Sequence, residues 1–454
     1  MKQPESTAAV GIVRRVINDP MMRNSVAIMS STVVTSVLGY AFWMIVARTF
    51  DRAVSGTAAA TTSAIQATVT IASVGGAAAM VQWVPRCTTA REWRQRVTTG
   101  FFVSVLAAAV GSLIVVGVLG VGLSTLPQLG HPLGAFLFCA ACVLFAAGIV
   151  IDYVAVSEHR GAMMLVRNML LCGLRIPLIL VPVSTLAGQD SILLAWTAAA
   201  GLSLLWVLAT FRSRAGHSLK PSFEHLPRHL REMASSLVGQ HLITVTAMLA
   251  GYVLPVVVYA RLSATANAYF YITWMLGSVF FMISPAVSAA LFVEGAANPV
   301  QMRALVRRCL LIVGGLLVVP MLAYLAGGRL VLGLFGRDYV THGFALLLLL
   351  TVSALPDAVT NIAVAVLRVT NRMHMALLLN ASMLVGCVVS AWIVLPSTGI
   401  IGAGVCWLLS QTVGAMWVIA NWRRIVGGAK AAVADVPQAV AADVLPAVVE
   451  GVDR

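Results

Sequence analysis

Charged residues are scarce in this chain. Only 10% of its 454 residues are Asp, Glu, Lys or Arg, against about a quarter in a typical soluble domain. Acidic residues are the scarcest, with 16 Asp and Glu against 30 Lys and Arg, while hydrophobic residues make up 60%. This composition excludes an ordinary soluble protein and indicates one that is embedded in a membrane.

Motifs for catalysis and cofactor binding are also absent. The sequence has no Gly-x-x-x-x-Gly-Lys-Ser/Thr loop for nucleotide phosphates. Loops expected outside the membrane are short and contain only isolated acids, namely Asp51, Asp190 and Asp338. Cys139 and Cys142 form a Cys-x-x-Cys pattern without a second pair or a nearby histidine, which makes a metal or redox site unlikely by spacing alone. We therefore expect no enzyme, no cofactor and no metal.

The chain instead contains about a dozen apolar segments, each long enough to cross about 30 Å of hydrocarbon as a helix. Residues 1–23 are polar and do not resemble a cleavable signal peptide. The expected helices cover residues 24–47, 54–84, 98–124, 133–155, 166–184, 190–211, 234–259, 264–293, 308–326, 341–367, 375–396 and 400–422.

Basic residues lie mainly in alternate loops between these segments. Arg and Lys accumulate in loops on the cytoplasmic side of membrane proteins. This distribution predicts an even number of spans, with both termini in the cytoplasm of a bacterial cell and the spans in its inner membrane. It also explains the net charge of +14 without a nucleic-acid partner.

A basic linker, expected at residues 212–233, follows the first six segments. Gly39-Tyr40 and Arg48 in the first helix have counterparts in Gly251-Tyr252 and Arg261 in the seventh. Repeated halves of this kind are typical of transporters. The expected organisation is an N-terminal segment 1–23, an N-lobe 24–211, the linker, a C-lobe 234–422 and a disordered cytoplasmic tail 423–454.

Three segments carry a resemblance to a known family. They are LGYAFWMIVARTFDRAVSGTAAATTSAIQATVTIASVGGAAAMVQWVP at 38–85, LFGRDYVTHGFALLLLLTVSALPDAV at 334–359 and LPSTGIIGAGVCWLLSQTVGAMW at 395–417. The chain resembles the polysaccharide-exporter branch, which includes lipid-linked oligosaccharide flippases, of the multidrug/oligosaccharidyl-lipid/polysaccharide exporter superfamily. That superfamily also contains multidrug extruders and peptidoglycan-precursor flippases.

The resemblance implies an all-α polytopic protein with about 12 transmembrane helices, in two pseudo-symmetric six-helix lobes around a central cavity. It implies a flippase that moves a polyprenyl-pyrophosphate-linked oligosaccharide by alternating access, for envelope polysaccharide assembly. Expected partners are this lipid-linked glycan, membrane lipids and other polysaccharide-assembly membrane proteins. The alternatives are a cation-coupled exporter of drugs or small amphiphiles and a membrane scaffold without transport activity. Multidrug members often carry an acid in the first helix, and this chain has none between Asn24 and Ala47.

Two charged residues are expected at matching depth in the hairpin of the fourth and fifth helices. Asp152 lies eight residues before Arg160, and Arg175 lies eight residues after Arg167. One interpretation is a structural Asp152–Arg175 ion pair. The other makes Arg175 a cavity cation for a pyrophosphate, which a guanidinium fork binds well.

Other polar residues within apolar segments are further candidates for the transport cavity. Asp357 follows Pro356, with Asn361 one turn later on the same helix face. The Asp357 carboxyl could carry a coupling H⁺ or Na⁺. Alternatively, it could hydrogen-bond the carbonyl that Pro356 frees, as a protonated donor, or pair with a buried arginine. Gln66 could contact sugars or link helices, and Gln240 and His241 begin the polar seam of the seventh helix.

Overall fold

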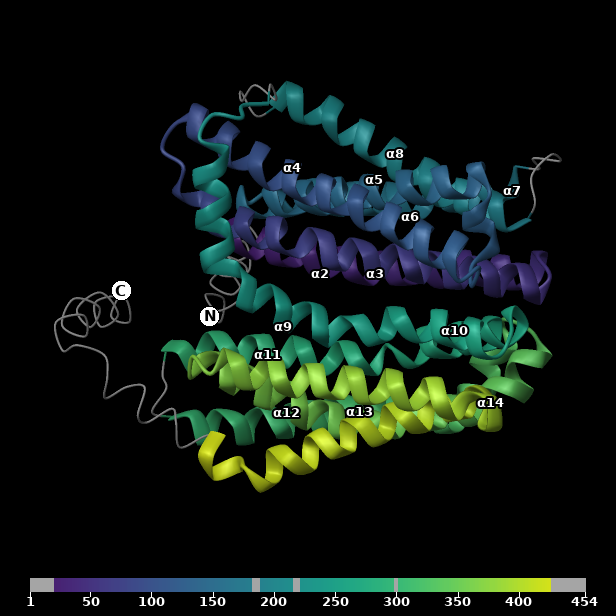
Figure 1. Ribbon diagram of the computed structural model, residues 1–454. Helices are drawn as coiled ribbons and strands as arrows, with labels where there is room; N and C mark the ends of the chain where they lie inside the picture. The colour runs from purple at the N-terminus through teal and green to yellow at the C-terminus, as the bar shows by residue number, and fades with distance from the viewer. Residues whose placement is uncertain (1–19, 182–187, 215–220, 298–300, 426–454) are drawn as a thin grey trace, which may run out of the picture. The chain divides into compact units, whose positions relative to one another are not determined.

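The computed structural model describes residues 20–181, 188–214, 221–297 and 301–425, and these residues are almost entirely helical (Figure 1). They form two compact units, Met1–Tyr271 and Ile272–Arg454. The predicted division into lobes at the linker 212–233 stays a prediction. Most of the predicted N-terminal segment and of the predicted tail lies outside the described residues.

The N-terminal unit is a bundle organised around one helix, α3. Its helices are α2 (Pro20–Thr49), α3 (Arg52–Trp83), α4 (Ala90–Val115), α5 (Pro132–Ser157), α6 (Gly161–Gly173), α7 (Arg175–Leu180), α8 (Gly188–Arg214), α9 (Leu226–Arg261) and the first part of α10 (Ala264–Gly277). Helix α3 packs against α4, α5, α8 and α9. Small residues allow this, since Ala59, Ala60 and Ala64 are buried on α3, and small side chains let membrane helices approach closely.

The C-terminal unit is organised around α13 (Arg337–Val369). This helix packs against α11 (Phe280–Ala297), α12 (Met302–Gly333) and α14 (Met373–Ala420). Helix α14 contains a kink at Gly399, whose φ of 64° and ψ of −157° are not helical. A Cβ at Gly404 would collide with Leu346 of α13. Glycine at position 404 therefore lets α13 and α14 pack closely.

Ten helices in the described part of the chain are long and apolar enough to cross a membrane. Large apolar side chains also point outward, as a lipid environment requires, and Leu311 and Val319 of α12 are 69% and 72% exposed. The chain is therefore an all-α, multi-pass membrane protein. The predicted number of twelve spans is not confirmed by this count, in which the kinked, 48-residue α14 counts as one span.

The fifth predicted helix, expected at residues 166–184, differs most from its prediction. Helix α6 already begins at Gly161 and ends at Gly173, and α7 begins at Arg175. Pro177 has no backbone N–H to bond the carbonyl of Gly173, which accounts for the break between the two helices. Arg167, which the prediction places at the very start of this helix, lies in the middle of α6 and is only 5% exposed.

Candidate functional site

Asp152 and Arg167 form a buried, two-pronged ion pair between α5 and α6. The Arg167 Nε donates to the Asp152 Oδ1 at 2.5 Å, and a second guanidinium nitrogen bonds Oδ2. The amide of Asn168 on α6 completes the group, since its Oδ1 accepts from Arg167 at 2.8 Å. Asp152 and Arg167 are 7% and 5% exposed, so this charge-assisted pair is shielded from solvent.

The sequence prediction that pairs Asp152 with Arg175 is therefore wrong. It places Arg167 at the membrane boundary and Arg175 at the depth of Asp152. Because α6 starts at Gly161, the hairpin turn lies closer to Arg167 than expected, and this arginine reaches the level of Asp152. At about 1.5 Å per residue, Arg175 then lies about 12 Å further along the hairpin.

Arg175 is buried among aromatic rings instead. Its guanidinium lies over the ring of Trp196 on α8, 3.8 Å from the centroid, and 5.4 Å from the centroid of Phe145 on α5. The side chain is 7% exposed and its Nε has no hydrogen-bond partner. Within the described residues it forms no ion pair with a carboxylate. Cation–π attraction offsets part of the cost of burying this charge, but the charge is not neutralised.

The aromatic rings continue away from Trp196. Phe42 of α2 meets Trp196 at a centroid distance of 6.5 Å and Trp43 at 5.7 Å. Trp43 in turn lies 4.6 Å from the ring of Tyr271 on α10. These rings and Arg175 form the aromatic cluster of the N-terminal unit. Sequence reasoning found Arg175 but not the rings. They come from four different helices, and the sequence pattern does not show which residues of these helices lie next to one another.

The predicted seam of α9 lies against α3. The Nε2 of His241 is 3.0 Å from the carbonyl oxygen of Ile71 on α3. The other ring nitrogen of His241 and the Oε1 of Gln240 are buried without a hydrogen-bond partner. Gln66 lies on α3 and is half-buried. These three candidates thus belong to the paired helices α3 and α9, and none of them contacts Arg175 in the described contacts.

Asp357 lies in the C-terminal unit, on α13. It is 6% exposed, its Oδ2 accepts no hydrogen bond, and no arginine in the described part of the chain pairs with it. Asn361 donates its amide to the Asp357 backbone carbonyl at 2.9 Å. Asp357 is therefore a buried acid without a cationic partner among the described residues. The alternative interpretation, in which Asp357 pairs with a buried arginine, does not predict this.

Sequence reasoning missed three further polar residues near this acid. The Thr360 hydroxyl donates to the Asp357 backbone carbonyl at 3.0 Å. Ser284 of α11 faces the Asp357 carboxyl and is fully buried. The Thr360 hydroxyl donates to the Oε1 of Gln411 on α14 at 3.1 Å. Serine and threonine are common in membrane helices, so only the spacing of Thr360, three residues after Asp357, could have pointed to this group.

No protein-family model and no curated protein matches the sequence. Among solved structures, the fold is similar to an inward-facing multidrug-resistance MATE transporter of the MOP superfamily, with 13% identity and a TM-score of 0.68 over 89% of this chain and 99% of that chain. The lipid II flippase MurJ, in an inward closed conformation, is 10% identical with a TM-score of 0.66 over 88% of this chain and 87% of that chain.

A MOP superfamily transporter from Pyrococcus furiosus is also similar, with 15% identity and a TM-score of 0.60 over 91% of this chain and 98% of that chain. Its structure is described as having a binding pocket of reverse polarity that suggests a different function. At such low identities these likenesses show the fold alone. The chain therefore shares the fold of these solved membrane transporters, which is the fold that the sequence resemblance predicts.

Proposed function

We propose that this protein is a flippase that carries a polyprenyl-pyrophosphate-linked oligosaccharide across the bacterial inner membrane by alternating access. The observation that supports this most is the environment of Arg175, a buried guanidinium stacked on Trp196 with no carboxylate partner among the described residues. A buried cation of this kind attracts an anion, and a guanidinium binds a phosphate through two parallel hydrogen bonds.

The other buried arginine of the hairpin, Arg167, differs from Arg175 in having a carboxylate partner. Arg167 is already neutralised by Asp152, so it has no capacity left for a second anion. A pyrophosphate that reaches this unit would therefore bind Arg175 and not Arg167. The aromatic cluster around Arg175 offers the stacking surfaces on which sugar rings and isoprenoid units commonly pack. The fold shared with the lipid II flippase MurJ fits a lipid-linked substrate of this class.

The proposal is tested with purified protein in liposomes that contain a fluorescent polyprenyl-pyrophosphate oligosaccharide. A membrane-impermeant quencher reports the fraction of substrate in the outer leaflet. Arg175→Gln removes the charge and should slow flipping at least about tenfold, the effect of losing one charge-assisted bond of about 1.4 kcal/mol or more. Arg175→Lys should keep part of the activity. Arg337→Gln removes the same charge at the exposed start of α13 and should change nothing.

In cells, deletion should lead to accumulation of a lipid-linked oligosaccharide in the cytoplasmic leaflet. Normal flipping by the Arg175→Gln protein would remove this residue from the site. If deletion changes only drug sensitivity and no lipid intermediate accumulates, the flippase proposal fails.

Asp357 supports a second candidate function, a cation-coupled exporter of drugs or small amphiphiles. A buried acid without a cationic partner suits an exporter of cations, and can carry a coupling H⁺ or Na⁺. The first helix lacks the acid that multidrug members often carry, since α2 has no Asp or Glu. We therefore rank this function second.

A further inference from the structure

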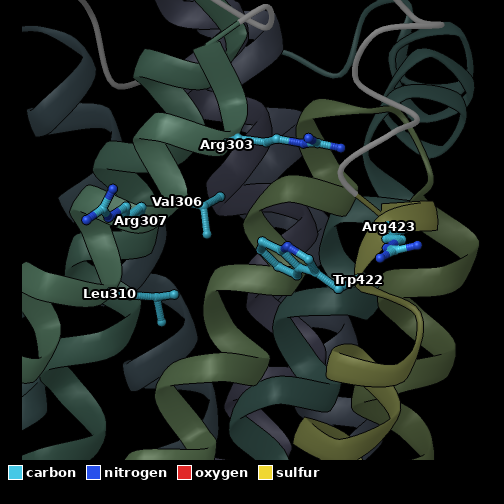
Figure 2. A pocket seen from close by; sticks show the side chains of 6 residues that line it. All are labelled: Arg303, Val306, Arg307, Leu310, Trp422 and Arg423. Atoms are coloured by element: carbon cyan, nitrogen blue, oxygen red, sulfur yellow. The ribbon is translucent and has the colours of Figure 1, made fainter.

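A basic pocket lies at one end of the C-terminal unit, between the start of α12 and the residues that follow α14 (Figure 2). The cavity measures about 410 Å³. Three arginines and three apolar side chains line it: Arg303, Arg307, Val306, Leu310, Trp422 and Arg423. Just after α14, the backbone is held by Arg372, which donates to the backbone carbonyl of Arg424 at 3.0 Å.

The three pocket arginines have no carboxylate partner among the described residues. Neighbouring Arg308, which does not line the pocket, has one: its guanidinium lies 3.9 Å from Glu294. Three like charges around one cavity produce a strong positive potential there. This arrangement attracts an anion with several oxygen atoms, such as a phosphate group.

The apolar residues of the pocket indicate that the anion is part of an amphiphile. Val306 is buried, Trp422 is half-buried and Leu310 is 41% exposed. Further along α12, the exposed side chains Leu311 and Val318 lie on the same helix face as Arg307 and extend the apolar surface away from the arginines. A soluble anion would use only the arginines, whereas a phospholipid would also cover the apolar surface with its acyl chains. Tryptophan is enriched at the depth of the headgroups, where Trp422 would then lie.

We infer that this pocket binds the headgroup of an anionic phospholipid, with its phosphate between Arg303, Arg307 and Arg423 and its acyl chains along α12. The charge pattern of the sequence predicts that this end of the unit faces the cytoplasm, where basic pockets between helices bind anionic lipid headgroups. The inference does not depend on the transported substrate, since the pocket lies wholly within the C-terminal unit.

Trp422 provides a direct probe of the site. The full-length protein is reconstituted in phosphatidylcholine liposomes with increasing fractions of brominated phosphatidylglycerol, whose bromine atoms quench tryptophan at contact. The signal of Trp422 is the difference between the wild type and Trp422→Phe. We expect this signal to be quenched at a low fraction of the anionic lipid, and only at a much higher fraction of brominated phosphatidylcholine.

Each arginine replaced by glutamine should raise the half-quenching fraction of phosphatidylglycerol about fivefold, the effect of one basic side chain near an anionic surface. The variants are Arg303→Gln, Arg307→Gln and Arg423→Gln. Arg424→Gln is the matched control, because it removes the same charge one residue outside the pocket and should leave the curve unchanged. Unaltered Trp422 emission in pure phosphatidylcholine shows that a variant is folded.

Three results would overturn the inference. The first is equal quenching of Trp422 by the anionic and the zwitterionic lipid. The second is an unchanged half-quenching fraction in the triple arginine variant. The third comes from competition. Inorganic phosphate serves as the soluble competitor: if it relieves the quenching as effectively as unlabelled phosphatidylglycerol, the pocket is a site for soluble anions and the lipid assignment is wrong.

Discussion

The guanidinium of Arg167 occupies the space that a side chain at position 148 would need: a Cβ at Gly148 would lie 2.6 Å from one of its terminal nitrogens. Gly148 is one turn before Asp152 on α5. The missing side chain lets the arginine lie flat on α5 and bond both carboxylate oxygens of Asp152. The glycine and the ion pair therefore form one structural unit that joins α5 to α6.

Removing one member of this pair should be more harmful than removing both. Arg167→Met leaves the carboxylate of Asp152 buried without a partner, and we expect the free energy of unfolding to fall by about 3–5 kcal/mol. The double variant Asp152→Asn/Arg167→Met leaves no buried charge and should recover most of this loss. The measurement is the denaturation of the purified proteins in detergent.

Gly148→Ala tests the role of the glycine in the same assay. It should destabilise the protein by a smaller amount, because Arg167 must shift but keeps its partner.

Additive effects of Asp152→Asn and Arg167→Met, without recovery in the double variant, would show that the two residues do not stabilise the protein as a pair.

The sequence predicts the helices of this chain well but their exact starts poorly. Long apolar segments are unambiguous, because only helices satisfy the backbone in hydrocarbon. The predicted depth of Arg167 depended on the predicted start of its helix. Because α6 begins at Gly161 and not at residue 166, Asp152 pairs with Arg167 and not with Arg175. The rings around Arg175 could not be predicted, since Phe145 and Trp196 lie on helices that meet Arg175 only in the folded bundle.

The kink of α14 should depend on glycine at position 399. Its φ of 64° and ψ of −157° lie in a region that only glycine adopts without strain, so Gly399→Ala should cost about 1–3 kcal/mol of stability. Gly386→Ala on the same helix is the matched control, because its Cβ would meet Ser410 at an ordinary 3.5 Å. Thermal unfolding measures both variants, and equal melting temperatures would contradict the role given to Gly399.

The buried acid of α13 should matter for energy coupling and not for folding. Replacement of Asp357 by Asn keeps the shape of the side chain but cannot take up H⁺ or Na⁺. With an imposed H⁺ or Na⁺ gradient, we expect the transport rate of this variant to fall to the rate measured without a gradient. Substrate binding should persist. Asp338→Asn at the start of α13 should leave coupling intact. A full response to the gradient in the Asp357→Asn protein would exclude this residue as the coupling site.

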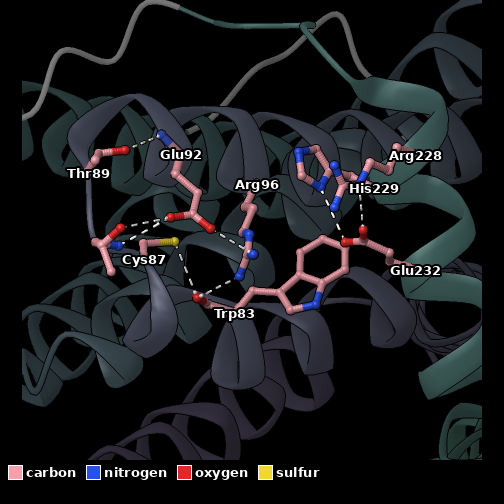
Figure 3. A network of polar contacts seen from close by, with 9 residues as sticks. Trp83, Cys87, Thr89, Glu92, Arg96, Arg228, His229 and Glu232 are labelled. Atoms are coloured by element: carbon pink, nitrogen blue, oxygen red, sulfur yellow. Dashed lines mark hydrogen bonds and ion pairs between the residues drawn. The ribbon is translucent and has the colours of Figure 1, made fainter.

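The start of α9 lies against the C-terminal end of α3 and the start of α4. Figure 3 shows Trp83 of α3 beside His229 of α9, with their ring centroids 6.1 Å apart. The Arg96 side chain of α4 bonds Glu92 at 2.7 Å and approaches the backbone carbonyl of Trp83 at 3.4 Å. Residues 221–225, which lie in the predicted linker just before α9, are mostly exposed.

Glu224 ties these residues to α4. Its Oε2 accepts hydrogen bonds from the Arg91 Nε at 2.9 Å and from the Gln95 amide at 2.8 Å. The ring of Phe223 lies 5.7 Å from that of Phe102. The hydrogen bonds from Arg91 hold the pKa of Glu224 below its ordinary value of 4.5. Contact with α4 is therefore strongest when Glu224 is ionised.

The contact should weaken in acid and not in base. A carboxyl whose pKa is lowered by folding stabilises the folded form above its unfolded pKa of about 4.5, and this stabilisation is lost as the pH falls through the lower, folded value. Both Glu224 and Arg91 are more than half exposed, so the effect is modest. Amide hydrogen exchange of residues 222–225, compared with that of Glu224→Gln at each pH, measures it. The variant should exchange severalfold faster at pH 7. The ratio of the two rates should start to fall as the pH drops below about 4.5 and should approach one once the pH is below the folded pKa of Glu224. Because intrinsic exchange rates cancel in this ratio, a ratio that keeps its pH 7 value after the carboxyl is fully protonated would contradict the assignment of Glu224 as the residue that holds the linker.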